Sequence, residues 1–389
     1  MTARGLDVVL LGLSLSSSWG NGHATTYRAL AGALTAAGHR VHFLERDVPW
    51  YASHRDLPAP PYCRLSLYGS LEELRERHGR ALADADLVVL GSYVPEGRGV
   101  ARLVQELARG VTAFYDIDTP VTVAALARGA CEYLEPSQVC GFDLYLSFTG
   151  GPLLARLERE LGARAARPLY CSADPEVHRP SRRPPRWDLG YVGTYSADRQ
   201  PALDALLVAP ARARAARRFV VAGPQYPAAL DWPANVERIE HLPPGEHAGF
   251  YGAQRFTLNV TRADMVRAGW SPSVRLFEAA ACATPILSDR WPGLETLFVP
   301  GREILLARDT REALAVLEGT TEEARRALGE RARRRVLAEH TADHRAEALV
   351  GYVHEVRGRG ARRGGAARTL GGSARREPEP EPPLAQGEG

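Results

Sequence analysis

The chain has 389 residues, a formal net charge of +3, and an ordinary balance of apolar (45%) and charged (24%) residues. This length accommodates two globular domains, and the small net charge gives no support for nucleic-acid binding. All 49 residues counted as lysine or arginine are arginines, which excludes a lysine-containing phosphate loop and Schiff-base chemistry on lysine. Phosphate recognition must therefore use arginine, backbone N–H groups or helix N-termini.

Neither a membrane span nor a disulfide framework is predicted. No apolar run approaches the ~18 residues that a span needs, and residues 1–15 lack the pattern of a signal peptide. The five cysteines are scattered, odd in number and without a CxxC pair, which argues against disulfides and a zinc site. We therefore expect a cytoplasmic protein without a transmembrane segment.

The first half of the chain alternates apolar strands with helices. Residues 6–12 are predicted to form a buried parallel strand, followed by a polar, glycine-bearing loop at 13–23 and a helix over about 24–37. A strand at 41–44 completes one βαβ unit. The loop lacks the G-x-G-x-x-G pattern, so a dinucleotide-dependent dehydrogenase is not supported. Further strands are expected at 86–90, 111–115, 144–148 and 168–172.

Residues 116–120, Asp-Ile-Asp-Thr-Pro, follow the strand at 111–115, where ligands gather in open parallel sheets. Thr119 and Pro120 can start a helix, and an aspartate favours its N-terminus. That explains one carboxylate better than two, so Asp116 and Asp118 are candidates for a general base or an acceptor contact. The pair also fits a D-x-D pattern that could hold a divalent cation, but residues 84–86 fit that pattern equally well.

Thr149 and Gly150 follow the strand at 144–148. Their backbone N–H groups could meet an anion or sugar hydroxyls, or form a plain strand-to-helix turn. The run RPSRRPPR at 179–186 is the clearest linker in the chain, because prolines stiffen it and charges keep it exposed.

After the linker, strands are expected at 188–192, 218–222, 236–239 and 256–260, and amphipathic helices at 322–337 and 342–356. The sequence after about Arg357 is rich in glycine and arginine and then reads EPEPEPP, which is typical of disorder. Two blocks of alternating strands and helices indicate an α/β protein. The expected domains are 1–178 and 187–320, followed by C-terminal helices at 321–356 and a disordered tail at 357–389.

The segment GWSPSVRLFEAAACATPILSD at 269–289 carries the most informative pattern. Ser271 can cap a helix that starts at Pro272 and ends near Ala283, before a buried strand. Within this apolar helix, burial of the Glu278 carboxylate is costly unless a partner compensates it. Arg275, three residues earlier on the same face, is one possible partner, and a ligand with hydroxyl groups is the other.

The run EAAACATPILSD resembles a segment of group 1 (family 4-like) glycosyltransferases, in which a glutamate opens an E-A-x-A-C-G-T-P-x-I run. SPSVRLFE and LNVTRADM are most similar to the CgeB-like branch, and the resemblance covers residues 5 to about 356. Two positions depart from the family. Trp270 stands where many members carry a second glutamate, and Ala283 stands where glycine is usual, which predicts a mildly strained left-handed helix end.

The resemblance implies the GT-B fold, in which two Rossmann-like domains face a cleft and C-terminal helices pack back on the first domain. The family glutamate holds the ribose of a nucleotide-sugar donor, and the turn after the first strand of the second domain approaches the donor diphosphate. The donor-binding residues implied in this way are Glu278, Arg275, Gly193, Thr194, Arg199, Asn259 and Ser273. In some inverting members a histidine in the first loop is the general base.

His23 and Asp118 are therefore the candidate catalytic residues, although a histidine near a helix start is often hydrogen-bonded only locally. The further candidates for the cleft or the acceptor site are Asn21, Gly22, Asp116, Thr149 and Gly150. The expected function is transfer of a hexosyl or related sugar from a nucleotide-diphosphate-sugar to an unknown glycan, lipid, protein or small molecule.

No metal or cofactor is expected, because arginines and helix N-termini would stabilise the leaving diphosphate. The alternatives are a nucleotide-sugar 2-epimerase, which needs no external acceptor, and a non-catalytic carbohydrate-binding relative. No nucleic-acid partner is expected.

Overall fold

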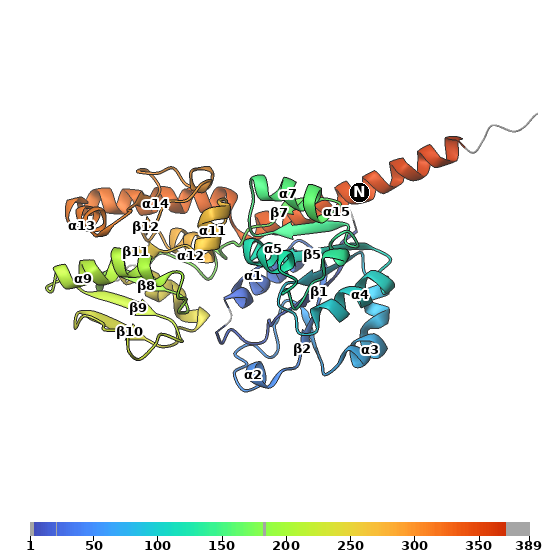
Figure 1. The fold of residues 1–389 in the computed structure, drawn as a ribbon, viewed down its shortest axis with the longest axis horizontal. Coiled ribbons are helices and arrows are strands. Elements are labelled where there is room, and N and C mark those ends of the chain that lie inside the picture. The colour runs from blue at the N-terminus through green and yellow to red at the C-terminus, as the bar shows by residue number, and fades with distance from the viewer. Residues whose placement is uncertain (1–3, 21, 182–183, 371–389) are drawn as a thin grey trace, which may run out of the picture.

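The structure is a computed structural model that describes residues 4–20, 22–181 and 184–370. Two parallel β-sheets covered by helices form two lobes that lie side by side (Figure 1). The strands of the first sheet come from residues 7–168, and those of the second come from residues 187–306. The expected α/β class with two Rossmann-like domains is confirmed.

Strands and helices alternate along the chain. The strands are β1 (Asp7–Gly12), β2 (Arg40–Arg46), β3 (Arg64–Tyr68), β4 (Leu87–Gly91), β5 (Val111–Asp116), β6 (Leu144–Ser147), β7 (Ala166–Pro168), β8 (Trp187–Val192), β9 (Phe219–Ala222), β10 (Val236–Ile239), β11 (Gln254–Asn259), β12 (Ile286–Ser288) and β13 (Leu305–Leu306). The α-helices are α1 (His23–Ala36), α2 (Pro49–Ala52), α3 (Leu71–Asp84), α4 (Gly97–Leu107), α5 (Thr119–Ala127), α6 (Pro136–Val139), α7 (Pro152–Leu161), α8 (Gln200–Leu203), α9 (Ala209–Ala213), α10 (His247–Gly252), α11 (Ala263–Ala268), α12 (Val274–Ala281), α13 (Thr310–Gly319), α14 (Glu322–Glu339) and α15 (Ala342–Leu370). Short helices of other types are η1 (Asp204–Val208), η2 (Pro244–Glu246) and η3 (Leu294–Thr296).

The first sheet has the order β3-β2-β1-β4-β5-β6-β7 and the second has the order β10-β9-β8-β11-β12-β13. The strand pairs are parallel in both sheets. The central strands β4 and β5 are buried along their whole length, as continuous apolar runs predict for a sheet covered on both faces. Each strand order changes direction once, beside β1 and beside β8, and ligands bind at the carboxyl ends of strands near such points.

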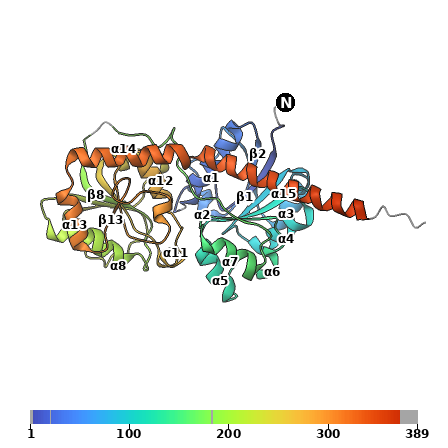
Figure 2. The ribbon, with the colours of Figure 1, turned by 90° about the horizontal axis from the view of Figure 1, so that it is seen from above.

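The C-terminal helices join the two domains. Figure 2 shows α14 along the second domain and α15 continuing across the first. The Nε group of buried Arg345 on α15 donates to the carbonyl of Tyr170 (3.1 Å), where the chain leaves the first domain. A main-chain hydrogen bond joins the start of α15 to the segment that leaves the first domain, because the N–H of Ala342 donates to the carbonyl of Ala173 (3.0 Å). The predicted return of the final helix to the first domain is confirmed.

Helix α15 is longer than expected. The sequence predicted a helix end at Val356 and disorder from Arg357, but the helix continues to Leu370. Arg357 donates to the carboxylate of Asp86 (2.7 Å), which ties this part of the helix to the first domain. The EPEPEPP part of the predicted tail lies outside the described residues.

Several boundaries and elements also differ from the expectations. The final strand of the first domain, β7, precedes the predicted 168–172, and α12 begins at Val274 with Ser273, not Ser271, at its N-cap. Strand β3 and helix α3 were not predicted. The sequence does carry a start signal for α3, because the hydroxyl of Ser70 accepts a hydrogen bond from the N–H of Glu73 (3.1 Å).

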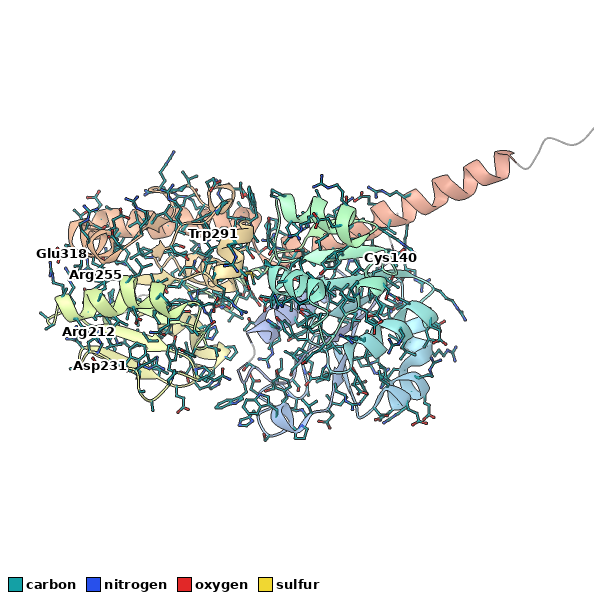
Figure 3. The ribbon with its side chains drawn as sticks, in the orientation of Figure 1. Cys140, Arg212, Asp231, Arg255, Trp291 and Glu318 are labelled. Atoms are coloured by element: carbon teal, nitrogen blue, oxygen red, sulfur yellow. The ribbon has the colours of Figure 1, made fainter. Side chains whose placement is uncertain are left out.

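All five cysteines are free, and the exposed one, Cys140, lies on the first domain (Figure 3). Among the described residues, no helix combines the length and the apolar character that a bilayer crossing requires.

Candidate functional site

A cleft of about 540 Å³ separates the two domains at the carboxyl ends of strands from both sheets. The first domain lines it with the loop after β1, the start of α1 and the segment after β5. The second domain lines it with the turns after β8 and β9, the segment after β11 and one face of α12. Its volume lies within the range of small-molecule sites.

Two carboxylates hold the loop after β1 in place. Buried Glu45 accepts hydrogen bonds from the N–H (2.9 Å) and the hydroxyl (2.6 Å) of Ser16. Asp56 accepts from the N–H of Ser18 (2.9 Å) and pairs with Arg28 (2.8 Å). Burial raises the pKa of Asp56, but the hydrogen bonds from Arg28 and Ser18 outweigh it and bring the pKa to about 2. The loop is therefore fixed by charge-assisted hydrogen bonds.

The same loop touches the second domain at Trp19. The Trp19 ring centroid lies 4.4 Å from that of His241, which belongs to the loop after β10. On its own domain, Trp19 stacks on His54 with a centroid distance of 4.5 Å. This aromatic contact bridges the two domains at the edge of the cleft. Gly22 lines the cleft, and Asn21 lies outside the described residues.

His23 is the first residue of α1 and lines the cleft. Burial lowers its pKa, and the nearby Asp118 carboxylate opposes that effect only in part. The imidazole is therefore mainly neutral at pH 7, which is the form that can accept a proton. The ring of Tyr93 lies close by, at a centroid distance of 5.6 Å.

Asp118 occupies the N-cap position of α5 and also lines the cleft. Its Oδ2 atom accepts a hydrogen bond from the Tyr93 hydroxyl (3.0 Å). The same oxygen lies 3.8 Å from Nη1 of Arg262, which belongs to the second domain. The two candidate bases, which come from different loops, therefore share one wall of the cleft.

Asp116 does not face the cleft. It is fully buried, and its two oxygens accept hydrogen bonds from the hydroxyls of Tyr145 and Thr122. Burial raises the pKa of Asp116 to about 7, although these hydrogen bonds oppose the rise. The predicted acceptor contact at Asp116 is therefore wrong, because strand β5 points this side chain into the domain. A cation held jointly by Asp116 and Asp118 would have to displace these hydrogen bonds.

Thr149 and Gly150 are used in the contact between the domains. The N–H of Gly150 donates to the carbonyl of Trp270 (2.9 Å), and the hydroxyls of Thr149 and Ser271 lie 2.7 Å apart. The backbone N–H of Thr149 donates to the Ser147 hydroxyl (3.0 Å), so the structure favours the alternative of a plain strand-to-helix turn over a role of Thr149 and Gly150 in the cleft. Trp270 has φ = 44° and covers Gly151, where an added Cβ would meet the indole at 2.4 Å. The position that departs from the family thus serves the domain contact.

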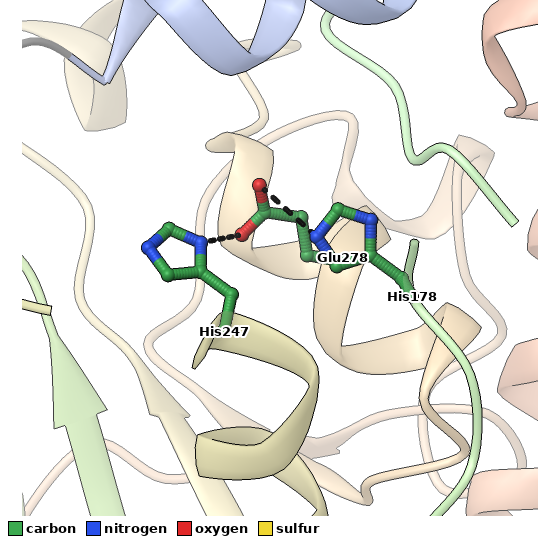
Figure 4. Close-up of side chains that lie close together, drawn as sticks. All are labelled: His178, His247 and Glu278. Carbon is green, nitrogen blue, oxygen red and sulfur yellow. Dashed lines mark hydrogen bonds and ion pairs between the residues drawn. The ribbon is translucent and has the colours of Figure 1, made fainter. Parts of the chain in front are cut away.

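Glu278 is buried on α12 between two histidines, as Figure 4 shows. Its Oε2 atom accepts a hydrogen bond from the Tyr251 hydroxyl (2.9 Å) and lies 3.3 Å from Nδ1 of His247. Its Oε1 atom lies 3.6 Å from Nε2 of His178, but accepts no hydrogen bond from any described residue. One carboxylate oxygen is thus held by the protein, and the other retains its capacity to accept.

Charge stabilises the ionised form of Glu278. Burial raises its pKa, but the charges of His247 and His178 and the hydrogen bonds to Oε2 outweigh that effect and bring the pKa to about 2. Burial lowers the pKa of His247, whereas the Glu278 carboxylate raises it, and the net shift is upward. The carboxylate is therefore ionised at neutral pH, although its side chain is almost fully buried.

The same cluster has the composition of a metal site. One ligand atom from each of His178, His247 and Glu278 lies within 4.8 Å of the others. Imidazole and carboxylate are ligands that zinc accepts. Metal binding would require His247 to release the proton that Glu278 stabilises. The sequence indicated no such cluster.

Arg275 anchors the second-domain side of the cleft. Its Nε donates to the carbonyl of Val192 (2.7 Å), and its Nη1 donates to Oδ1 of Asn259 (2.9 Å). The hydroxyl of Ser273 donates to the same Asn259 oxygen (2.7 Å). The ion-pair partners of Glu278 are the two histidines, so the alternative of a pair with Arg275 is wrong. Asn259 holds Arg275 and Ser273, both of which line the cleft.

The turn after β8 places Gly193, Thr194 and Arg199, three of the expected donor-binding residues, along the cleft. The Nη2 group of Arg199 donates to the carbonyl of Thr194 (2.6 Å), while its buried Nε has no acceptor among the described residues. Arg199 therefore has donor capacity left, in contrast to the Nε and Nη1 groups of Arg275.

Sequence reasoning missed the neighbours of the predicted residues. His247 and Tyr251 are four residues apart on α10, a spacing that could have suggested a shared face. Arg262 stands in the quoted run LNVTRADM. Tyr93 and His178 gave no local signal, because they reach Asp118 and Glu278 only through the fold.

Comparison with known proteins supports this architecture. Residues 199–351 match the family model described as glycosyl transferase-like. No curated protein matches the chain.

Solved structures resemble almost the whole chain. A sucrose-phosphate synthase from Thermosynechococcus elongatus is 17% identical, with a TM-score of 0.69, over 90% of this chain and 99% of that one. HepE of Anabaena, in complex with UDP-glucose, is 11% identical, with a TM-score of 0.67, over 90% of this chain and 100% of that one. An α-glucosyltransferase, in complex with UDP-glucose and DNA containing an abasic site, is 12% identical, with a TM-score of 0.64, over 90% and 100%. These likenesses show the GT-B fold.

Proposed function

We propose that the protein is a glycosyltransferase that moves a hexosyl or related group from a nucleotide-diphosphate-sugar to an acceptor. The family match over the second domain and the C-terminal helices supports a transferase. A donor of this kind also agrees with the UDP-glucose named for two structural neighbours. Assignment to the CgeB-like branch rests on the runs SPSVRLFE and LNVTRADM.

The main support for this proposal is the environment of the Glu278 carboxylate. A buried, ionised carboxylate has one oxygen held by Tyr251 and His247, while Oε1 accepts no hydrogen bond from a described residue. An unused acceptor is costly in a buried position, and a hydroxyl group of a ligand would remove that cost. Glu278 also stands where the resembling family holds the donor ribose. We therefore assign Glu278 to the ribose.

The reaction would place the donor diphosphate beside the turn after β8 and the acceptor against the first domain. The acceptor hydroxyl would give its proton to His23 or Asp118 as its oxygen bonds to the anomeric carbon. The bond from that carbon to the diphosphate oxygen would break, and the diphosphate would leave with the electron pair. Arg199 and the charge of Arg275 would stabilise that leaving group.

We propose that this transfer needs no metal and no cofactor besides the donor substrate. The test incubates the protein with UDP-, GDP- and ADP-sugars, with and without simple glycosides as acceptors, and measures released nucleoside diphosphate and new products. Glycosylated product is expected, and its formation should survive EDTA. An epimerised donor formed without acceptor would favour a 2-epimerase, and no turnover would favour a carbohydrate-binding protein. Loss of turnover in EDTA, with recovery on addition of Mn²⁺ or Zn²⁺, would contradict metal independence.

The five free cysteines are compatible with a reducing compartment, and we propose a cytoplasmic location. We also retain the domain limits 1–178, 187–320 and 321–356 as a proposal.

A further inference from the structure

Arg262 connects the two walls of the cleft. It follows β11 and occupies the N-cap position of α11. Its neighbours in the chain are fixed, because Asp289 accepts from the N–H of Thr261 (2.9 Å) and Asp198 accepts from the N–H of Ala263 (3.0 Å). Its side chain lines the cleft and reaches Asp118 on the opposite domain.

The guanidinium of Arg262 forms long ion pairs with Asp118 and Asp198 but no hydrogen bond to either carboxylate. Nη1 lies 3.8 Å from Oδ2 of Asp118, and Nε lies 3.7 Å from Oδ2 of Asp198. Both distances exceed those of a hydrogen bond. The Nε atom is buried and has no acceptor among the described residues. Within the described part of the chain, Arg262 therefore has an unused donor at Nε and lies beside two carboxylates, one from each domain.

The donor capacity of Arg262 contrasts with that of Arg275, whose Nε and Nη1 groups bond to Val192 and Asn259. Arg262 lies on the same cleft as Arg199, and its contact with Asp198 places it beside the turn that carries Arg199. A diphosphate in that turn offers several charged oxygens. It would attract the guanidinium more strongly than one carboxylate oxygen at 3.8 Å does.

We propose that Arg262 binds the donor diphosphate and that it pairs with Asp118 only while the donor is absent. Donor binding transfers the guanidinium from Asp118 to the phosphate oxygens. Asp118 Oδ2 then keeps the hydrogen bond from Tyr93 and is free to accept one from the acceptor hydroxyl. The acceptor site is thus completed only after the donor has bound. This inference rests on the proposed function and adds an order of binding to it.

The test is a double-mutant cycle on nucleotide affinity, measured by calorimetry on the full chain. UDP, GDP and ADP are screened first, and the tightest is used together with its nucleoside. Arg262→Gln should weaken the diphosphate about tenfold or more and leave the nucleoside unchanged. The matched control is Arg267→Gln, because Arg267 lies on the same helix and is largely exposed beside Asp264.

The variant Asp118→Asn tests whether Asp118 competes with the phosphates for Arg262. If Asp118 holds Arg262 away from the phosphates, Asp118→Asn should tighten diphosphate binding by about 1.5- to 5-fold, as expected for release of a partly exposed ion pair. That gain should vanish in the Arg262→Gln background. An equal gain in both backgrounds would mean that the Asp118 charge weakens diphosphate binding by long-range repulsion and not through Arg262. That result would overturn the proposed change of partner by Arg262. Wild-type affinity in Arg262→Gln would overturn the role of Arg262.

Different results would contradict the proposed function and the role of Arg262. If the wild type binds none of UDP, GDP and ADP, the proposed function is wrong and this inference falls with it. If the wild type binds a nucleoside diphosphate and Arg262→Gln does so equally, only the role of Arg262 is wrong. Arg262→Lys, which keeps the charge, should recover part of the affinity and controls for misfolding.

Discussion

The two walls of the cleft differ in how their functional groups are held. On the second-domain wall, Arg275 and Glu278 lie on one helix. The Val192 carbonyl and the Asn259 side chain accept from Arg275, and the Tyr251 hydroxyl donates to one oxygen of Glu278. On the first-domain wall, His23 and Asp118 come from separate segments. Among the described residues, the Asp118 carboxylate accepts one hydrogen bond, from Tyr93, and forms a long ion pair with the other domain. The second-domain wall is thus preorganised for a ligand, whereas the first-domain wall depends on contact with the other domain.

The largest expected effect comes from the first-domain wall. His23→Ala and Asp118→Asn are compared under single-turnover conditions with saturating donor. Loss of the general base should slow the chemical step by about 10²–10⁴-fold and leave donor affinity within a few-fold. The variant with the larger loss identifies the base. Near-wild-type rates in both would contradict a base on this wall and would favour substrate-assisted or retaining chemistry.

The second prediction separates the two aspartates of the D-x-D run. Asp116→Asn replaces one acceptor oxygen by a donor NH₂ group, so the hydroxyl of Tyr145 or Thr122 loses its partner. The free energy of unfolding should fall by about 1–3 kcal/mol, with little change in the single-turnover rate. If Asp118 is the base, Asp118→Asn should show the opposite pattern. A rate loss in Asp116→Asn at full stability would contradict the structural role of Asp116.

The difference between the walls also explains what the sequence could predict. The α/β class, the two domains and the helix that carries Arg275 and Glu278 follow from local patterns, because a periodic apolar run and a short motif determine them. The left-handed end of α12 was likewise predictable, and Ala283 has φ = 55°. Tyr93, His178 and Arg262 reach the site only through tertiary packing. Asp116 was misassigned because the direction of its side chain depends on the register of β5, which the five-residue run 116–120 does not reveal.

The third prediction concerns pH and the second-domain wall. The pKa of His247 is raised, so its contribution to the free energy of unfolding is fully present below about pH 6.5 and is lost as the pH rises through the folded value. The pKa of Glu278 is lowered to about 2, so its contribution is present above about pH 4.5 and is lost as the pH falls toward 2. The pair should therefore stabilise most between these limits.

Denaturant titrations of the wild type and Glu278→Gln across pH 3–9 check this window. The variant should lose the dependence that the pair causes, while the other groups facing it (His178, Tyr251 and Arg275) remain. Parallel curves for the two proteins would contradict the charge coupling between His247 and Glu278.

The smallest expected effect is at the end of α12. Ala283 adopts a left-handed conformation that favours glycine, so Ala283→Gly should raise the free energy of unfolding by up to about 1 kcal/mol. The matched control is Ala280→Gly within the same helix, which should lower it by about 1 kcal/mol. Two losses of equal size in thermal or denaturant unfolding would contradict the strain at Ala283.

The central claim, that Glu278 binds the ribose, is tested most directly by one affinity comparison. The nucleoside diphosphate that binds tightest and its 2′,3′-dideoxy analogue are titrated into the wild type and Glu278→Gln, with Tyr251→Phe as a control that alters only the oxygen held by the protein. A charge-assisted bond to Oε1 is worth about 1.5–3 kcal/mol, so Glu278→Gln should weaken the ribonucleotide roughly 10- to 140-fold. The penalty should largely vanish with the dideoxy analogue. Equal weakening of both nucleotides, or of neither, would contradict ribose recognition by Glu278.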